Sequence, residues 1–318
     1  MLNYYIVDAF TDRPFGGNTA GVVLLGDEAF PADELMQSVA AELRYSETAF
    51  VRRLAEDDYH LRYFTPCGEV ELCGHATVAT FALLHRLGMA HGACRCHTLA
   101  GDLDISLPGS SLETGEVSRS DGGVLMQMAT PRIVRTLTAE ETADAYRAVG
   151  LEGSPLCDCR SYSFRGQATH PPLQERDGVK QFPAIIAYAG LPDIMLHVPE
   201  EQLNALRPDM EAIAALTTRL SAISIHAYAL CDRDGISACV RDFAPACGVP
   251  EESATGTANA ALAHALREFG VVAPDATCRF LQGEAMGRPS VVVAQLSADG
   301  QVRIGGHATL VAQGTLMV

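Results

Sequence analysis

The alternation of apolar and polar residues along the first part of the chain predicts short strands, turns and one amphipathic helix. Residues 3–10 and 20–25 are rich in strand formers, and the segment between them contains Pro, Gly and Asn, which are typical of turns. Residues 32–43 have helical spacing, with Asp33 as a candidate N-cap. Residues 45–53 and the later part of EDDYHLRYFTP predict two strands joined by a hairpin turn.

Two further segments have a different pattern, because they are apolar on nearly every helical face. Residues 74–88 and 256–270 each run from Gly to Gly and contain ATVATFALLHRL and ANAALAHAL. A helix that is apolar all round is buried on all sides, and the neighbouring predicted strands are the available cover. The pattern predicts an α+β fold in which curved, mostly antiparallel sheets each wrap around a central buried helix.

The chain also repeats a segment. R-x-F-x-P occurs at Arg62 and at Arg241, and a C-G pair follows in both copies. An offset of 179 residues superposes the two motifs and matches the order of the predicted elements around them. A period of this size indicates two domains and not a solenoid. Chance similarity of two α+β domains is the alternative, but the joint agreement favours a duplication.

The duplication and the composition of one segment predict the domain boundaries. Residues 108–122 turn to Gly, Ser and charged residues, which is typical of a linker. We therefore expect two pseudo-symmetric domains, 1–118 and 119–318. The GHAT that recurs at Gly306–Thr309 is neither preceded by an F-x-P loop nor followed by a long helix, so His307 is interpreted as incidental.

Composition and charge exclude several classes of partner. The 318 residues are 48% hydrophobic, which is ample for full cores, and the net charge is −16 with a pI of about 5.0. Nucleic-acid binding is disfavoured because phosphate contacts need clustered Lys and Arg. Neither a signal peptide nor an apolar run of membrane-spanning length is visible, so we expect a cytoplasmic protein that does not bind membranes.

The ten cysteines and the glycine-rich loops do not predict a metal or a cofactor. Cys94-x-Cys96-His97 and Cys157-x-Cys159 are too tightly spaced and too far apart for a typical zinc site, so reduced thiols are expected. GGNTAG is not a dinucleotide-binding fingerprint, and a phosphate-binding P-loop motif does not occur. The expected cofactor is therefore none.

The starts of the two apolar helices are candidate substrate-binding sites. Helix N-termini offer unpaired N–H groups and a partial positive charge, and Gly-His-Ala-Thr and Gly-Thr-Ala-Asn let a ligand approach the backbone. We predict that a small anionic substrate, a carboxylate, is held between the two helix starts across an interdomain cleft. The alternative is that small residues only cap these helices tightly.

Among the groups near these loops, Glu47 is the candidate proton carrier. It lies in SETAFV, and if Ala49 and Val51 share its face and point inward, its carboxylate is buried and its pKa raised, which suits general acid/base catalysis. An exposed strand glutamate is the alternative. A histidine such as His75, taken alone, is more often a structural residue at a helix start than a catalyst.

The motifs together resemble one known family. FTPCGEVELCGHAT, SETAFV, VDAFTDRPFGGNTAGVVLL and EESATGTANAAL are similar to segments of the PhzF-like phenazine-biosynthesis proteins, and the likeness runs from the first strand to the last. The resemblance implies the diaminopimelate epimerase fold, with two pseudo-symmetric domains, and a last strand, at about 308–318, that returns to the first domain. It also implies a homodimer.

The resemblance also implies an activity. PhzF-like enzymes are cofactor-independent isomerases, and the best-known member moves a proton within trans-2,3-dihydro-3-hydroxyanthranilate. The family's proton-shuttling glutamate and its CGHAT histidine correspond to Glu47 and His75, and its acidic and hydroxyl positions to Glu252 and Thr257. Residues expected to bind the substrate are Asn18, Cys73, Gly74, Ala76, Thr255 and Gly256.

Some positions depart from the family pattern. The E-D-P-x-T-G-S motif has Glu252, Ser253 and Thr257 here in place of Asp, Pro and Ser, and the common G-N-P is Gly17 to Thr19, G-N-T. Related racemases use two thiols, but here the second thiol position holds Thr255, so a two-thiol racemase is not expected and Cys73 is interpreted as a structural thiol. Epimerisation of an amino-acid-like substrate, or metabolite binding without turnover, remain the alternatives.

Overall fold

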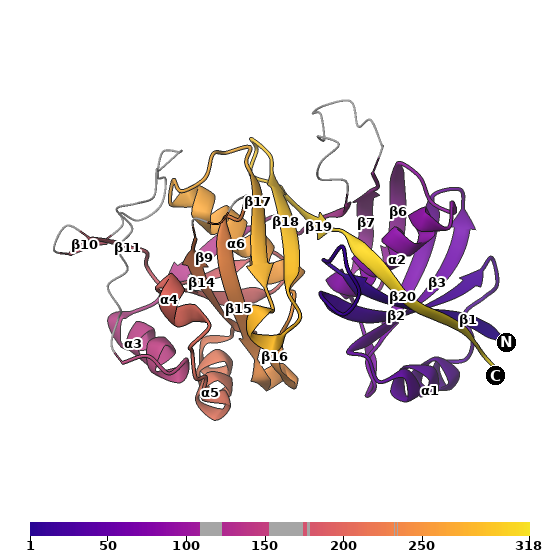
Figure 1. Cartoon of the computed structure of the whole chain (residues 1–318), viewed down its shortest axis with the longest axis horizontal. Helices are drawn as coiled ribbons and strands as arrows, with labels where there is room; N and C mark the ends of the chain where they lie inside the picture. Colours follow the sequence, from indigo (N-terminus) through magenta and orange to yellow (C-terminus); the bar gives the residue numbers. More distant parts are fainter. Residues whose placement is uncertain (109–122, 153–173, 177–178, 232, 234) are drawn as a thin grey trace. The chain divides into compact units, whose positions relative to one another are not determined.

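The computed structural model describes residues 1–108, 123–152, 174–176, 179–231, 233 and 235–318. Most of the expected linker, as well as Cys157 and Cys159, lies outside these ranges. The chain divides into two compact units. Unit 1 contains Met1–Gln127 and Gly305–Val318, and unit 2 contains Met128–Ile304. Figure 1 shows both units coloured along the sequence.

Unit 1 is a mostly antiparallel sheet around one helix, as the apolar pattern predicts. Strand β1 pairs antiparallel with β2 on one side and with the C-terminal β20 on the other, so the two ends of the chain lie side by side (Figure 1). The elements of unit 1 are β1 (Leu2–Ala9), β2 (Asn18–Gly26), α1 (Asp33–Leu43), β3 (Glu47–Ala55), β4 (Asp58–Phe64), β5 (Glu69–Val70), α2 (Gly74–Arg86), β6 (Ala93–Thr98), β7 (Gly101–Ser106), β8 (Val124–Gln127) and β20 (Ala308–Leu316).

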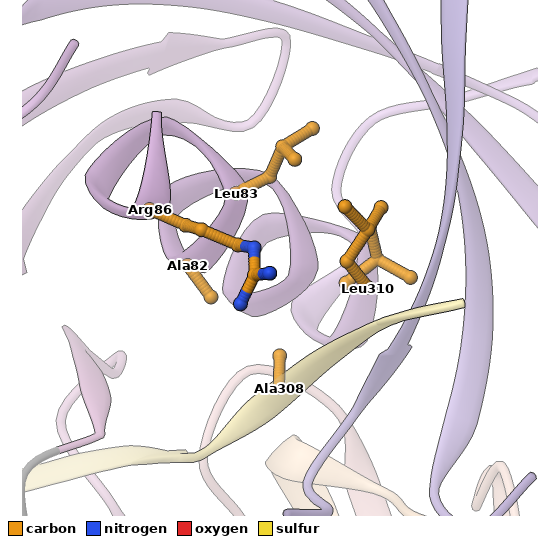
Figure 2. Close-up of a pocket in the computed structure, with 6 residues that line it drawn as sticks. Ala82, Leu83, Arg86, Ala308 and Leu310 are labelled. Carbon is orange, nitrogen blue, oxygen red and sulfur yellow. The ribbon is translucent and has the colours of Figure 1, made fainter. Parts of the chain in front are cut away.

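Helix α2 forms the centre of unit 1. Nine of its thirteen residues are buried, including Phe81, which meets the ring of Tyr59 edge-on at 5.6 Å between centroids. Figure 2 shows the C-terminal half of this helix, with Arg86, beside Ala308 of β20; these residues and their neighbours line a small, shallow pocket. None of the residues expected to bind the substrate lines this pocket, so it belongs to the packing of helix against sheet.

Unit 2 repeats this plan around helix α6, which also buries nine of its thirteen residues. In Figure 1 strands surround this helix. The elements of unit 2 are β9 (Arg132–Thr136), α3 (Ala139–Ala148), β10 (Gln174–Arg176), β11 (Val179–Gln181), β12 (Ile185–Tyr188), β13 (Pro192–His197), α4 (Glu200–Leu203), α5 (Met210–Leu220), β14 (Ile225–Leu230), β15 (Ala238–Ala244), η2 (Pro245–Cys247), β16 (Val249–Glu252), α6 (Gly256–Glu268), β17 (Thr277–Gln282), η3 (Glu284–Met286), β18 (Ser290–Leu296) and β19 (Val302–Gly306).

Strand pairing supports the duplication inferred from the sequence. Parallel β2–β3 corresponds to parallel β13–β14, antiparallel β3–β4 to β14–β15, and parallel β4–β6 to β15–β17. The register of β3 and β14 departs from the offset of 179 by two residues. Tyr63 pairs with Ala49 in unit 1, and Asp242, its counterpart in the repeat, pairs with His226 in unit 2, so His226 corresponds to Ala49.

The repeated R-x-F-x-P motif has the same structural role in both units. The Arg62 guanidinium donates to both carboxylate oxygens of Glu69, at 2.7 and 2.6 Å, and lies 5.3 Å from the ring centre of Phe64. Arg241 donates to Glu251 at 2.8 and 2.9 Å and lies 4.9 Å from the ring centre of Phe243. In each unit the arginine therefore ties its own strand to the loop that leads into the central helix.

One local expectation needs correction. Helix α1 begins at Asp33, but the N-cap is Ala32, whose side chain makes no capping hydrogen bond; the Asp33 carboxylate instead accepts from Arg62 at 2.8 Å. The Asp33 carboxylate binds Arg62 instead of the N–H groups at the helix start. The local sequence pattern cannot show this partner, because Arg62 comes from another element.

The second GHAT belongs to a strand region, as expected from the missing loop and helix. Gly305 packs against the backbone of β8 at its first residue, where an added Cβ would lie 1.7 Å from the carbonyl oxygen of Val124. Gly123 crosses Gly306 at similarly close range, with 2.3 Å from an added Cβ to the Gly306 carbonyl carbon. These glycines are therefore required by close backbone approach, and β20 follows directly.

Candidate active site

The start of helix α2 brings together four of the side chains expected at the site. Cys73 is the N-cap residue, with an extended backbone (φ −138°, ψ 113°), and makes no side-chain capping bond. His75 follows in the first turn and is 5% exposed, while Glu47 opens strand β3 and Asn18 opens β2. The pairing of β2 with β3 places these strand starts beside one another at the helix N-terminus.

His75 is the centre of this group. Its Nε2 lies 3.2 Å from Glu47 Oε2 and 3.3 Å from Ser46 Oγ. Its Nδ1 lies 3.3 Å from Asn18 Nδ2 and 3.4 Å from Cys73 Sγ. The imidazole therefore links the strand starts to the helix start.

Burial determines the charge of this histidine. Loss of solvent lowers the pKa of His75 below its usual value, and the carboxylate of Glu47 opposes that shift only in part. A neutral imidazole carries one N–H. The amide nitrogen of Asn18 is a donor, so it fits a bare Nδ1, and the proton then sits on Nε2, where it faces Glu47 Oε2. The local contacts fit a neutral His75 whose Nε2–H donates to Ser46 Oγ, while Glu47 Oε2 lies close by without a hydrogen-bond partner among the described residues.

Glu47 is half-buried, with 21% of its side chain exposed. Ala49 and Val51 lie on the same face of β3 and are buried, which is the condition that the sequence analysis set for a buried Glu47. Oε2 is the buried oxygen of the carboxylate and lies against His75. One end of the carboxylate is thus held by protein while the side chain keeps some exposure to solvent, an arrangement that suits a group that must exchange protons.

The same group could hold a metal ion. The ligand atoms of Glu47, Cys73 and His75 all lie within 4.8 Å of one another, and thiolate, imidazole and carboxylate are the ligand types that zinc prefers. Within the described residues a second such set consists of Glu200, Cys231 and Cys239. Cys94 and Cys96 belong to neither set, and both thiols have pKa values raised to about 12 by burial.

The start of helix α6 brings the predicted residues of unit 2 together. Thr255 is the N-cap residue, and its hydroxyl lies 3.0 Å from Asp242 Oδ2 and 3.4 Å from Glu252 Oε2. Thr257 lies in the first turn, where an added Cβ on Gly190 would be 3.3 Å from its methyl group. Glu252 and Thr255 are thus in contact, and Thr257 packs against a neighbouring glycine.

The two helix starts are built alike. In unit 1 the Thr77 hydroxyl donates to the carbonyl of Cys73 at 2.7 Å, and in unit 2 the Asn259 amide donates to the carbonyl of Thr255 at 2.8 Å. The backbone of Thr255 (φ −122°, ψ 111°) is close to that of Cys73. Each N-cap residue is therefore fixed by a side chain from the next turn.

Comparison with known proteins identifies the family. Residues 7–314 match the PhzC-PhzF family, described as phenazine biosynthesis-like protein. A relative from Deinococcus radiodurans named "Uncharacterized isomerase" is 34% identical over 323 residues, covering 99% of this chain and 94% of that protein. The chain belongs to the PhzC-PhzF family.

Solved structures agree with this assignment. A PhzF-family phenazine biosynthesis protein from Bacillus anthracis has a TM-score of 0.78 at 23% identity, covering 100% of this chain and 99% of that one. A hydroxyproline epimerase from Agrobacterium vitis has a TM-score of 0.56 at 13% identity, covering 98% and 90%. The predicted α+β, diaminopimelate epimerase-like fold is confirmed.

Some polar residues of this PhzC-PhzF protein were missed by sequence reasoning. Ser46 contacts His75, and in unit 2 the buried His226 and Asp242 lie behind Thr255. In the structure His226 corresponds to Ala49 of the repeat, so the duplication gave no signal for it. Asp242 lies inside the R-x-F motif, at the position of Tyr63, and the alternation of β15 gave no reason to single it out because both its faces are buried.

Proposed function

We propose that this protein is a cofactor-independent isomerase that moves a proton within a small, carboxylate-bearing substrate, with Glu47 as the general acid/base. The observation that carries the proposal is the 3.2 Å approach of Glu47 Oε2 to Nε2 of the buried His75, at the N-terminus of α2. Family membership supports it, since relatives of this chain are named isomerases.

The proposed reaction consists of two proton transfers, and Glu47 carries the proton in both. The ionised Glu47 removes a proton from one carbon of the substrate and becomes a carboxylic acid, while the electron pair moves through the substrate's π system. The acid then returns the proton to a second carbon, so charge and proton count are restored. Neutral His75 lies 3.2 Å from the carboxylate without supplying a competing positive charge.

Substrate binding is proposed to use the helix starts. The first-turn N–H groups at Gly74, His75 and Ala76 favour a carboxylate, because they point along the helix axis and carry the positive end of the dipole. Asn18 and Cys73 belong to the same group of residues, since both contact Nδ1 of His75. In unit 2 we assign the corresponding roles to Glu252 and Thr257, with Thr255 and Gly256, in the same reaction.

The decisive experiment follows exchange of substrate hydrogen with solvent. Incubation with trans-2,3-dihydro-3-hydroxyanthranilate and with a panel of cyclic amino acids in deuterium oxide should give deuterium incorporation detectable by NMR. Glu47→Gln should reduce the rate by about 10²–10⁴-fold, the contribution typical of a general acid/base. Glu56→Gln, at an exposed turn, is the matched control and should leave the rate unchanged.

The outcomes separate the candidate functions. Exchange that Glu47→Gln leaves unchanged would overturn the role of Glu47. Incorporation with inversion at a single carbon would identify an epimerase of an amino-acid-like substrate. Saturable binding without exchange would indicate a metabolite-binding protein.

Light scattering after size exclusion tests the expected homodimer, and fractionation of cells tests the expected cytoplasmic location.

A further inference from the structure

Unit 2 contains a buried network of ionisable and polar side chains behind Thr255. Asp193 in β13, His226 in β14 and Asp242 in β15 are 2%, 0% and 1% exposed. Ser224, just before β14, is 1% exposed and bridges the two carboxylates. Charged groups at this depth persist only when their hydrogen bonds compensate the lost hydration, so the positions of the protons can be deduced from the contacts.

Backbone groups fix the orientation of the two amides in this network. Gln282 Oε1 accepts from the N–H of Thr255 at 3.1 Å, and Gln282 Nε2 donates to the carbonyl of Glu252 at 2.8 Å. Asn259 Nδ2 donates to the carbonyl of Thr255 and to Gln282 Oε1, each at 2.8 Å. The remaining Asn259 oxygen is therefore an acceptor, and it faces His226 Nε2 at 3.3 Å.

His226 consequently has an acceptor at each ring nitrogen. Nδ1 lies 3.0 Å from Asp242 Oδ1, and Nε2 lies 3.3 Å from Asn259 Oδ1. A neutral imidazole would leave one nitrogen lone pair facing an acceptor, whereas an imidazolium donates to both. The contacts assign a protonated His226 paired with an ionised Asp242.

The hydroxyl of Ser224 shows that a further proton is present. It lies 2.9 Å from Asp193 Oδ1 and 2.7 Å from Asp242 Oδ1, but it carries only one hydrogen. If that hydrogen goes to the ionised Asp242, Asp193 must itself be the acid that donates to the serine oxygen. Burial and the nearby charge of Asp242 raise the pKa of Asp193 to about 7, which agrees with a protonated Asp193.

The other oxygen of Asp193 supports the same assignment. Among the described residues Asp193 Oδ2 has no hydrogen-bond partner although it is fully buried. An ionised carboxylate with a bare, buried oxygen would be costly, whereas the carbonyl oxygen of a neutral acid tolerates this environment better. The cluster thus contains one protonated carboxyl, one carboxylate and one imidazolium.

We propose that the Asp193–Ser224–Asp242 cluster, with His226, holds one proton on Asp193 and exchanges a second proton with Glu252 through the hydroxyl of Thr255. The hydroxyl joins Asp242 Oδ2, at 3.0 Å, to Glu252 Oε2, at 3.4 Å, and it also accepts from Gln282 Nε2 at 3.0 Å. The use of the exchanged proton in turnover rests on the proposed function, whereas the proton on Asp193 does not.

The proton step balances within the network. When Glu252 is protonated, it donates to the Thr255 oxygen while the Thr255 hydrogen passes to Asp242, so that Glu252 becomes a carboxylate and Asp242 a neutral acid. The reverse step returns the proton. His226, Asp242 and Asp193 do not touch substrate in this scheme, so they are positioning and proton-storing residues that act through Thr255.

Within the described part of the chain, a cysteine is a titratable group that feels the charges of the cluster. Cys247, in η2, has its pKa raised by burial and by the charges of Asp193 and Asp242. Two neutral amide side chains lie beside the cluster: Asn259 comes from α6 and Gln282 from β17. A raised pKa keeps Cys247 neutral near pH 7, so His226 is the cation of the cluster.

The first test locates the imidazolium. Nitrogen-15 NMR of the ten histidines at pH 8 should show an imidazolium signal that is lost in His226→Gln. His97→Gln is the matched control, because exposed His97 also lies between two carboxylates, Asp58 at 2.9 Å and Asp102 at 2.7 Å. If His226→Gln does not fold, the signal that survives in His97→Gln is that of His226. Absence of such a signal would overturn the assignment.

The second test follows the stored proton through stability. Because the pKa of Asp193 is raised on folding, the folded state holds this proton at pH values where the unfolded chain has lost it, and the contribution of Asp193 to stability falls as pH rises from about 4 to 7. Asp193→Asn mimics the neutral acid, so its urea midpoint relative to wild type should rise over this window. The exposed Asp104→Asn should show no such trend. A flat difference for Asp193→Asn would refute the stored proton.

The third test examines the link to Glu252. The carbon-13 carboxyl signal of Glu252, assigned through Glu252→Gln, should titrate in two steps because strongly coupled groups share their titrations. Thr255→Val should remove the step contributed by the cluster, and Thr255→Ser, which keeps the hydroxyl, should retain it. A single step in the wild type, or two steps in Thr255→Val, would overturn the relay while leaving the role of Glu47 intact.

Discussion

At the scale of single residues, environment determines which of several similar side chains can do chemistry. His75 and His97 each lie beside carboxylates, but His75 is 5% exposed and His97 is 30% exposed. Burial lowers the pKa of His75 and keeps it neutral, so that it adds no positive charge beside the catalytic carboxylate. The same residue type therefore has different protonation in different parts of the chain.

The neutral state of His75 predicts a pH dependence of folding stability. Its pKa is lower in the folded state than in the unfolded chain, so the unfolded chain binds more protons near and below pH 6.5, and stability is lost as pH falls through that range. Urea midpoints of wild type relative to His75→Gln should therefore decline from pH 7 to pH 5. His307→Gln, at an exposed position, should show no trend. A difference that grows toward low pH would contradict a neutral, buried His75.

At the scale of elements, the repeated arginine motif connects a strand to a functional loop. Arg241 is 8% exposed and forms two hydrogen bonds to Glu251, with further bonds to the carbonyls of Leu203 and Leu206 at 3.2 and 3.3 Å. Arg62 makes the equivalent pair in unit 1 and is more exposed. The motif was visible in the sequence, but its partners lie on other elements and came only from the fold.

Loss of the Arg241 guanidinium group should destabilise unit 2. Arg241→Lys keeps the charge but cannot reproduce two parallel hydrogen bonds and the stacking on Phe243, so we expect a loss of about 1–3 kcal/mol in the free energy of unfolding. Arg233→Lys, whose arginine is 40% exposed, should cost less than about 1 kcal/mol. Equal effects of the two substitutions in urea unfolding would contradict the structural role of the motif.

At the scale of the whole molecule, the chain returns to its first unit at the end. Strand β20 pairs with β1 over Leu2 to Ala9, and the N-terminal ammonium donates to the carbonyl of Val318 at 2.9 Å. None of the helices in the described part of the chain is long and apolar enough to cross a membrane. Unit 1 therefore depends on residues more than 300 positions apart in the sequence.

Removal of the last strand should weaken unit 1 selectively. A chain ending at His307 exposes one edge of β1, so amide hydrogen exchange in β1 and β2 should accelerate by at least about tenfold, while amides of α6 and β15 in unit 2 keep most of their protection. A chain lacking only Met317 and Val318 is the control and should retain protection. Uniform acceleration in both units would contradict this division of stability.

The sequence by itself determined the order of elements, the α+β class, the two central helices and the duplicated motif. These follow from local periodicity and from repeated residues, which need no knowledge of partners. It also singled out Glu47 and His75, because their motifs are contiguous and distinctive. The contact between them depends on β3 and α2 meeting, which the structure supplied.

Only the tertiary structure revealed the network of Asp193, His226 and Asp242. These residues are separated by up to 49 positions and become partners only because β13, β14 and β15 are neighbours in one sheet. Their charges depend on burial and on hydrogen-bond partners, and neither quantity is encoded in the local pattern. Proton positions are therefore a property of the folded chain, while the elements that hold them are a property of its sequence.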